Sequence, residues 1–474
     1  MVRIFVIVLF LQVYQAQVLN YNSWNMQLLA RINPDTSVNP TPVGNRYSGC
    51  WGWFQANKNR EYVISGTANG TYFVDITNPN VPVVCDFVGG KTGCTWREIK
   101  TYQNYCYVAS DDAKPNTFQI IDMQYLPDSV HVVHNSNTII ERGHTLWIDQ
   151  NKLYVGMTTF SVGSSPMSIF SLATPSAPVL LRRLEQDIST SIINQVHDMY
   201  VRNDTVYASA GWQGLQILVY KPQQNVFQPV SAYASYPFAG YNHSSFLTQN
   251  GKYLLFCDES PASLPLHMID VQNLNNPQPL QSFKIRPQTT AHNPYMLGNQ
   301  WAIVASYQDG LIVLDISQPS NIREVGYFDT YPQGGFNTGF YGGGAYAGNW
   351  GAYPFFPSGR IAAQDMQNGI FILNPSAAFT SSVSYPVGTV GITDYSAITE
   401  FIYPNPTIDQ VFIKSSVLPR KIDIYGVEGC FLGSIFENQM HAFNLNDLSL
   451  KPGIYFAYWY VQGIQYNSKI FKNE

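Results

Sequence analysis

Short apolar runs alternate with turn residues in a pattern that repeats along most of the chain. Each repeat holds an apolar strand, a turn and a second apolar strand, and the pattern occurs seven times. The first strands occupy residues 61–66, 106–110, 153–157, 206–210, 253–258, 301–306 and 360–364, and the second strands occupy 71–75, 118–122, 167–171, 215–220, 266–270, 311–315 and 370–374. The repeats lie roughly 45–60 residues apart, a period typical of propellers and solenoids.

Turn residues flank the second strand of the repeat. Asn69-Gly70, Asp309-Gly310 and Asn368-Gly369 precede it and can adopt positive φ, which a tight hairpin between right-twisted strands requires. At the far end of most repeats, an Asp, Ser or Asn can hydrogen-bond its own downstream backbone. The prolines that then stop the strand are Pro79, Pro127, Pro175, Pro277 and Pro319.

Two further strands flank each apolar pair. A third apolar strand follows it, as in residues 81–88 and 323–328, and a leading strand comes before it. In four repeats the leading segment carries a histidine followed three residues later by an aromatic side chain; these segments are 143–155, 196–208, 242–256 and 291–304. Four strands per unit of roughly 50 residues, repeated seven times, predict an all-β fold with a seven-bladed β-propeller over residues 18–378.

The last repeat ends at residue 376 without a third strand. A propeller must close on itself, because an open blade edge is an aggregation hazard. Residues 25–34, NMQLLARINP, look like the missing outer strand. We therefore expect residues 25–33 to pair with the blade that contains residues 360–373.

The net charge and the N-terminal segment indicate which classes of partner are excluded and in which compartment the protein acts. The 474 residues carry a formal net charge of −5 and no Lys/Arg cluster, which argues against nucleic acid or an acidic membrane surface as partner. Residues 1–17 place Arg3 before an apolar run and reach Ala16, as a secretory signal peptide does; a buried N-terminal strand is the alternative. Since no later segment has 18 uninterrupted apolar residues, we expect no transmembrane segment in the mature chain.

Six cysteines are scattered along the chain without a CxxC pair. An exported protein can form disulfides, but this set does not make a framework. If one pair bonds, we expect Cys50 with Cys94, because both fall just before equivalent strands of adjacent repeats. Buried free thiols are the alternative.

The repeats resemble those of the LVIVD-repeat propellers known as choice-of-anchor B proteins. The segments that carry the resemblance are 50–79, 96–110, 301–317 and 350–373, and the likeness covers about residues 25–378. The third and fourth repeats depart from the LVIVD consensus. The resemblance implies a propeller fold and an extracytoplasmic address, without a settled activity.

The last 74 residues, 401–474, carry a second pattern. Their alternating strands predict a small β-sandwich with Asn405-Pro406 and Gly453 as turn positions. The segments 402–415, 421–430 and 448–473 are similar, in the expected order, to a type IX secretion C-terminal sorting domain. The residues that carry this motif are Pro404, Asn405, Pro406, Thr407, Gly453, Ile454, Tyr455 and Lys469. An ordinary adhesive or carbohydrate-binding sandwich is the alternative.

The sorting-domain resemblance implies an export route. Such a domain directs cargo through the outer membrane of Bacteroidota-type cells by the type IX secretion machinery, is then cleaved, and leaves the mature protein attached to surface lipopolysaccharide. Residues 379–400 are rich in Ser, Thr and Gly, as an exposed linker would be, so we expect cleavage there. The protein is then secreted or held on the outer cell surface.

The candidate chemistry is a periodic histidine series. His144, His197, His243 and His292 begin equivalent leading strands, which line a propeller channel, and Arg97 with Glu98 occupies the same register in the second blade. Asp198 follows His197. Neutral imidazoles that face one another can bind Zn²⁺, and a metal-activated water can hydrolyse a substrate. We favour a structural role, in which each histidine ties neighbouring blades together through its two nitrogens.

Two other features are candidate binding sites. Asp111-Asp112 and Asp258-Glu259 close hairpins and can bind Ca²⁺ or stand as solvated turns. The Gly-rich run 334–351 predicts a long aromatic loop over one face, in which Tyr341, Tyr346 and Trp350 can stack on sugar rings or cover the channel. No GxSxG, Walker or HExxH motif occurs.

These features lead to three functional hypotheses. We expect an extracellular binding or scaffolding protein whose ligand is a glycan or a protein. The alternative is a metal-dependent extracellular hydrolase that uses the histidine ring, and the third is a structural surface-layer component. The sequence does not decide whether the protein is an enzyme.

Overall fold

The computed structural model describes residues 21–37, 41, 44–112, 116–286, 290–332, 346–389, 401–403, 407–414, 421–426, 431–436, 442–461 and 464–473. The predicted signal peptide, Tyr341 and Pro404 to Pro406 lie outside these residues. The chain divides into two compact units, residues 1–391 and 392–474, and each is described by itself. The helices that the structure describes lack the length and apolar character of a bilayer-spanning segment.

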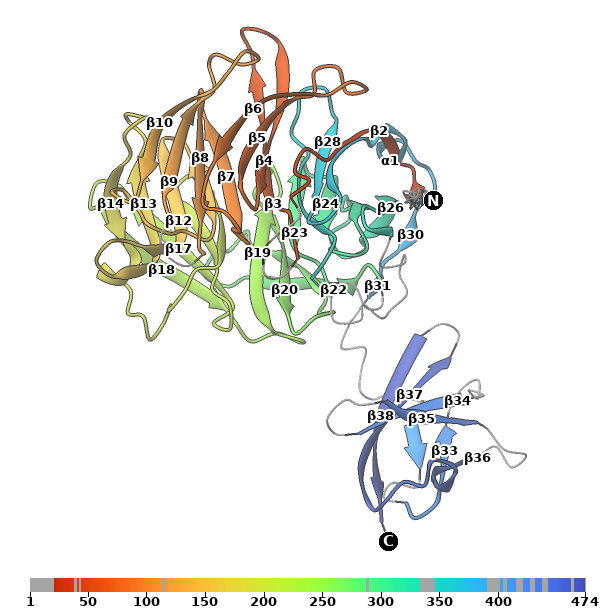
Figure 1. Cartoon of the computed structure of the whole chain (residues 1–474). Helices are drawn as coiled ribbons and strands as arrows, with labels where there is room; N and C mark the ends of the chain where they lie inside the picture. Colours follow the sequence, from red (N-terminus) through yellow and green to blue (C-terminus); the bar gives the residue numbers. More distant parts are fainter. Residues whose placement is uncertain are drawn as a thin grey trace, which may run out of the picture. The chain divides into compact units, whose positions relative to one another are not determined.

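The described residues of the first unit form seven antiparallel sheets (Figure 1). The first sheet holds β3 (Tyr47–Gln55), β4 (Arg60–Thr67), β5 (Gly70–Asp75) and β6 (Val83–Gly89), and the second holds β7 (Arg97–Tyr102), β8 (Tyr105–Ser110), β9 (Phe118–Asp122) and β10 (His131–Ser136). The third sheet holds β11 (Leu146–Asp149), β12 (Lys152–Thr159), β13 (Ser164–Ser171) and β14 (Val179–Arg183), and the fourth holds β15 (Asp198–Arg202), β16 (Thr205–Ser209), β17 (Leu215–Lys221) and β18 (Val226–Tyr233). The fifth sheet holds β19 (Tyr241–Leu247), β20 (Tyr253–Ser260), β21 (Leu266–Asp270) and β22 (Gln278–Lys284). The sixth is β23 (Asn293–Leu297), β24 (Trp301–Ala305), β25 (Leu311–Asp315) and β26 (Arg323–Phe328), and the seventh is β27 (Asn349–Tyr353), β28 (Ile361–Asp365), β29 (Gly369–Asn374) and β2 (Gln27–Ile32). A short 3₁₀ helix, η1 (Leu184–Gln186), follows β14.

The sheets are arranged in a ring. Each leading strand contacts the leading strand of the next sheet, from β3 through β7, β11, β15, β19 and β23 to β27, and β27 contacts β3 again. Apolar side chains fill the spaces between neighbouring sheets, as in the cluster that joins Tyr62 and Phe73 of the first sheet to Ile99 and Val108 of the second. The predicted all-β propeller fold is therefore confirmed.

The N-terminal segment completes the seventh sheet. β2 pairs antiparallel with β29, from Gln27 opposite Asn374 to Ile32 opposite Ile370, which confirms the predicted pairing of residues 25–33. Leu29 and Ile32 pack against a buried apolar cluster that includes Ile370. A second N-terminal strand, β1 (Ser23–Trp24), pairs with β26 in the sixth sheet. The two ends of the propeller are therefore held together by backbone hydrogen bonds and by apolar packing.

The hairpin turns follow the predicted chemistry with one exception. Gly310 (φ +72°) and Gly369 (φ +93°) adopt positive φ, and a Cβ on either would lie within 2.4 Å of a backbone oxygen. Gly70 does not adopt positive φ, so the expectation at Asn69-Gly70 was wrong. Glycine is needed there for space, because a Cβ would lie 2.3 Å from Val88 O.

Part of the predicted linker 379–400 is attached to the propeller. Its first residue, Phe379, is also the last residue of helix α1 (Ser376–Phe379). Phe379 stacks on Trp301 at 5.2 Å between ring centroids. β30 (Tyr385–Pro386) pairs with the outer strand β26, and β31 (Gly388–Thr389) pairs with the outer strand β22. Residues 390–400 lie outside the described residues. The cleavage site expected in this segment stays a prediction.

The described residues of the second unit form two sheets with a shared core. One sheet holds β32 (Phe401–Tyr403), β33 (Gln410–Lys414) and β36 (Ala442–Asn444), which precedes a 3₁₀ helix, η4 (Leu445–Leu448). The other holds β35 (Phe431–Phe436), β34 (Lys421–Gly426), β37 (Gly453–Val461) and β38 (Ile464–Lys472). Val411 and Phe443 of the first sheet share an apolar cluster with Ile424 and Trp459 of the second, as expected of a small sandwich. Gly453, Ile454 and Tyr455 begin β37, and Lys469 lies on β38.

The expected Cys50–Cys94 disulfide is not formed. The five cysteines within the described ranges are free thiols, and Cys430 lies outside those ranges. Cys50 lies inside β3, whereas Cys94 precedes β7, so the two positions are not equivalent. The Cys94 thiol instead lies 2.9 Å from Asp112 Oδ2 and 3.2 Å from Trp96 O.

Two buried carboxyl groups in the first unit, those of Asp365 and Asp329, have raised pKa values. Asp365 ends β28, where it accepts hydrogen bonds from the backbone N–H groups of Gln367 (2.9 Å) and Asn368 (2.8 Å). Burial raises its pKa from 3.8 to about 7, and burial raises the pKa of Asp329 to about 6. Between the ordinary pKa of 3.8 and these raised values, the folded state binds more protons than the unfolded state. The free energy of unfolding therefore falls as the pH rises through this window.

We expect the substitution Asp365→Asn to flatten this pH dependence. The amide keeps an oxygen that can accept the two backbone N–H groups, but it has no proton to lose. Between about pH 5 and pH 8 the wild-type protein should therefore lose more stability than the variant. Denaturant unfolding of the full chain across this range measures the difference, and parallel slopes for the two proteins would contradict the raised pKa.

Candidate functional site

Four histidines form an arc at one end of the propeller channel. His144, His197 and His292 lie just before β11, β15 and β23, and His243 lies in β19. The ring centroids of successive histidines are 4.1, 4.4 and 4.3 Å apart. The structure thus brings together the whole histidine series that the sequence predicts.

Trp350 and Trp96 extend the arc. Trp350 lies 4.0 Å from His292 between ring centroids and stacks on Trp96 at 4.7 Å with an interplanar angle of 9°. The prediction that Trp350 belongs to a long loop was wrong, because it lies in β27, the leading strand of the seventh sheet. The sequence held a signal for this position: Tyr353 follows Trp350 by three residues, as an aromatic follows each histidine.

Hydrogen bonds at Nδ1 orient the imidazole rings. His197 Nδ1 lies 3.2 Å from His243 O, and His292 Nδ1 lies 2.5 Å from Trp350 O, so each ring reaches the neighbouring blade. A carbonyl oxygen only accepts, so Nδ1 carries the proton in both rings and Nε2 keeps its lone pair. These bonds are the ties between blades that the structural interpretation predicts. They also leave Nε2 free for another partner.

The four histidines do not share one direction of pKa shift. Burial lowers the pKa of His197 and of His292 well below 6.5, and it lowers the pKa of His243 as well. Burial also opposes the charge on His144, but a hydrogen bond from its Nδ1 to Asp111 Oδ2 (2.5 Å) raises its pKa overall. The pKa of His144 is thus shifted in the opposite direction from the pKa values of the other three histidines, which burial holds in their neutral forms.

Glu259 comes next to the arc from another strand. It lies near the end of β20, with its Oε2 3.7 Å from His243 Nε2, and its Oε1 accepts a hydrogen bond from Tyr307 Oη. One ligand atom from each of His197, His243 and Glu259 lies within 4.8 Å of the other two. The sequence pattern places Glu259 beside Asp258 at the close of a hairpin and does not indicate its approach to the histidines.

The carboxylates of Asp111-Asp112 and Asp258-Glu259, for which the sequence leaves Ca²⁺ binding or a solvated turn open, accept hydrogen bonds from different neighbours. Asp258 accepts hydrogen bonds from Gly240 N (2.8 Å) and Tyr236 Oη (3.0 Å), away from Glu259. Asp112 accepts from Thr95 N at 2.9 Å, whereas Asp111 holds His144. These carboxylates are already used by nearby donors.

An open cavity of about 650 Å³ lies over the histidine arc. Six Trp and Tyr side chains contribute to its wall: Trp96, Trp212, Tyr241, Tyr307, Tyr346 and Trp350. Trp212 is 67% exposed and meets Tyr241 edge-on at 5.6 Å, and Tyr346 is 41% exposed. The predicted aromatic residues Tyr346 and Trp350 thus meet here, with Glu259 and three of the histidines in the same wall.

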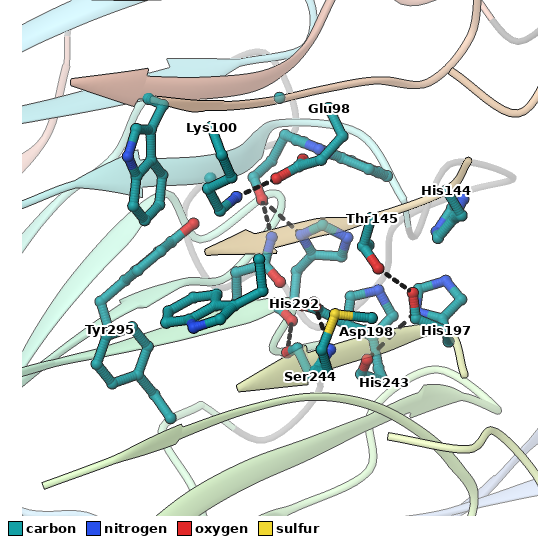
Figure 2. Close-up of a pocket in the computed structure, with 18 of the residues that line it drawn as sticks. Glu98, Lys100, His144, Thr145, His197, Asp198, His243, Ser244, His292 and Tyr295 are labelled. Carbon is teal, nitrogen blue, oxygen red and sulfur yellow. Dashed lines mark hydrogen bonds and ion pairs between the residues drawn. The ribbon is translucent and has the colours of Figure 1, made fainter. Parts of the chain in front are cut away.

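A smaller pocket of about 60 Å³ is lined by the arc and by residues of the leading strands, among them Glu98, Lys100 and Asp198 (Figure 2). Glu98 pairs with Lys100, whose Nζ lies 4.2 Å from the Trp51 ring centroid. Burial raises the pKa of Asp198, which also lines the pocket, to about 7. Glu98 and Asp198 thus lie where the sequence predicts polar channel groups.

The guanidinium of Arg97 is held by backbone carbonyl groups. Its Nε donates to Thr67 O (2.9 Å) and its Nη2 donates to Lys91 O (2.8 Å). These bonds hold the side chain against backbone of the first sheet and of the segment that leads into β7. The sequence predicts Arg97 as a ligand-binding residue because it occupies the position of the histidines in the leading strand of the second blade, and this stays a prediction.

Two family models match separate parts of the chain. Residues 401–473 match the secretion system C-terminal sorting domain. The chain ends in a secretion sorting domain. Residues 297–330 match the LVIVD repeat, and in the structure they span β24, β25 and β26. The sorting domain implies handling by the type IX secretion machinery and a cell-surface or secreted location.

Solved structures resemble the propeller at low sequence identity. The periplasmic gluconolactonase PpgL of Pseudomonas aeruginosa is 10% identical with a TM-score of 0.51, and the match covers 73% of this chain and 96% of that one. U3-55K (10% identical, TM-score 0.47) is matched over 71% of this chain and 99% of its own. The propeller domain of Cps50 (Swd1) from Myceliophteria thermophila (10% identical, TM-score 0.45) is matched over 72% and 99%. No curated protein matched the sequence. At this identity the PpgL similarity supports the fold alone.

Proposed function

We propose that this exported propeller binds a glycan outside the cell, in the aromatic cavity at the histidine end of its channel. The observation that carries the proposal is the open cavity of about 650 Å³, whose wall gathers six aromatic side chains around a few polar groups. Ligand sites are typically concave and mainly apolar, with a small number of polar groups that fix the orientation of the ligand. The protein thus acts as a binding or scaffolding protein.

The chemistry of the wall favours a sugar over an extended peptide. Aromatic ring faces can pack against the C–H faces of sugar rings, and Trp212 and Tyr346 are exposed enough to offer such faces. Glu259, Ser260 and Gln367 supply donors and acceptors for hydroxyl groups in the same wall. A protein ligand is the other outcome that a binding screen can return.

The proposal includes the route to the surface. We expect residues 1–17 to be removed as a signal peptide and the sorting domain to be cleaved off within the linker 379–400. Attachment to surface lipopolysaccharide would then keep the propeller at the outer face of the cell. N-terminal sequencing and the mass of the surface form test these processing steps.

We expect Trp212→Ala to weaken glycan binding by about 10- to 100-fold, because truncating an aromatic anchor at a binding site typically costs about 2 kcal/mol or more. Trp212 is largely exposed, so its loss should leave the fold intact. A glycan array followed by titration of the retained glycan measures the effect. The matched control is Tyr125→Ala, an exposed aromatic outside the cavity wall that stacks on His131. Equal affinities for the wild type and the Trp212 variant would contradict the proposal.

The second candidate is a metal-dependent extracellular hydrolase. It is favoured by the approach of Glu259 to His197 and His243 at the base of the same cavity, where a bound metal would activate water. Chelation distinguishes the two functions. A binding protein keeps its glycan unmodified after chelation, whereas a hydrolase converts it and stops when the metal is removed.

A further inference from the structure

We propose that His197, His243 and Glu259 bind one divalent transition metal ion at the base of the aromatic cavity. The metal site shares this cavity with the proposed glycan site, but its formation does not require the glycan. It differs from the histidine-only site that the sequence suggests, because it combines two of the four histidines with the carboxylate of Glu259. His144 is already bound to Asp111.

The spacing of the three ligand atoms supports the site. Each residue offers one ligand atom within 4.8 Å of the other two, and His243 Nε2 lies 3.7 Å from Glu259 Oε2. Tetrahedral ligation at about 2.0–2.2 Å places neighbouring ligand atoms about 3.4 Å apart. Small side-chain movements therefore suffice to bring the three atoms into coordination.

The hydrogen bonds around the ligands orient them for coordination. The bond from His197 Nδ1 to His243 O leaves His197 Nε2 with a free lone pair. Tyr307 donates to one carboxylate oxygen of Glu259 and leaves the other toward His243. Metal sites commonly use such outer contacts to fix the tautomer and the direction of a ligand.

His292 provides a second, independent observation. Its Nδ1 is bonded to Trp350 O, so its Nε2 is an acceptor, and this buried atom has no hydrogen-bond partner among the described residues. A buried acceptor without a donor is unfavourable and is often explained by an ion or a water at the site. The ring of His292 is adjacent to that of His243, at 4.3 Å between centroids, so this unpartnered acceptor lies on a residue beside the proposed site.

The ligand set selects the type of metal. Two imidazole nitrogens with one carboxylate oxygen suit Zn²⁺ and similar transition metals, whereas Ca²⁺ and Mg²⁺ prefer oxygen ligands alone. Three protein ligands would leave a coordination position open toward the cavity. We therefore use Zn²⁺ and Co²⁺ as the probes.

The test is metal binding by the full chain, purified without a histidine tag and stripped with a chelator. We expect one equivalent of Zn²⁺ per chain by elemental analysis, and the visible absorption of a low-symmetry Co²⁺ site. Glu259→Gln and His243→Gln should each weaken the affinity by at least about tenfold, since even outer-contact changes cost about 10- to 100-fold. The matched control, His131→Gln, changes an exposed histidine on β10 and should bind as the wild type does.

Each outcome supports or overturns the site. Binding of less than one equivalent at micromolar Zn²⁺, or equal affinities for the wild type and the Glu259→Gln variant, would overturn it. If His243→Gln does not fold, as judged by circular dichroism, Glu259→Gln alone decides, because Glu259 is only partly buried. Trp212→Ala should bind Zn²⁺ normally, so loss of glycan binding without loss of metal separates failure of the proposed function from failure of this site.

Discussion

A mature chain that begins after residue 34 should unfold at a temperature about 10 °C or more below the wild type, and less cooperatively. The deletion removes the β2–β29 ladder and uncovers the cluster on which Leu29 and Ile32 pack. Hydrogen bonds contribute about 1 kcal/mol each and a buried Leu or Ile about 1.5–3 kcal/mol, so the loss amounts to several kcal/mol. It also exposes a strand edge that can pair with another chain. Differential scanning calorimetry of the two chains measures the effect.

A second truncation distinguishes the effect of losing the β2–β29 pairing from the effect of shortening the N-terminus. A chain that begins at Met26 loses β1, which pairs with β26 in the sixth sheet, but keeps β2. This variant should unfold much closer to the wild type than the longer deletion does. If both truncations cause the same small change, the β2–β29 pairing does not hold the ring closed.

Removing residues 401–474 should reduce the amount of protein outside the cell to background. The type IX machinery handles cargo through the C-terminal sorting domain, and this chain carries that domain at residues 401–473. The first compact unit ends at residue 391, so the truncated chain keeps every strand of the propeller. Immunoblots of medium, surface and periplasm from a type IX-competent bacterium measure the distribution.

The control is the full chain in the same bacterium with type IX secretion disabled. The truncated chain in the competent strain and the full chain in the disabled strain should both remain inside the outer membrane with a folded propeller, as judged by resistance to protease. Appearance of the truncated chain on the surface at the wild-type level would contradict the assignment of residues 401–473 as the export signal.

The ring fold was predictable because each strand leaves a local pattern. The predicted strands 301–306 and 311–315 correspond to β24 and β25 within a residue, since both are apolar runs bounded by turn residues. Closure by the N-terminus followed from the missing strand of the last repeat. Equivalent positions in a repeat share a place in the ring, so the histidine series also predicted its own arc.

Other contacts depend on tertiary structure that no local pattern encodes. β30 and β31 are two residues each and form because the outer edges of β26 and β22 are available to them. Glu259 comes to His197 and His243 from the second strand of its sheet, whereas the histidines belong to leading strands. The Cys50–Cys94 prediction was wrong because Cys50 lies inside β3 whereas Cys94 precedes β7, so the two cysteines do not occupy equivalent positions in their repeats.

The central claim is that the ligand binds at the histidine end of the channel. A crystal structure of the full chain with the glycan that it retains is the most direct test. The account predicts that a sugar ring contacts Trp212 or Tyr346 within the cavity of about 650 Å³. A glycan bound instead on the outer strands of the blades, or on residues 401–473, would contradict it.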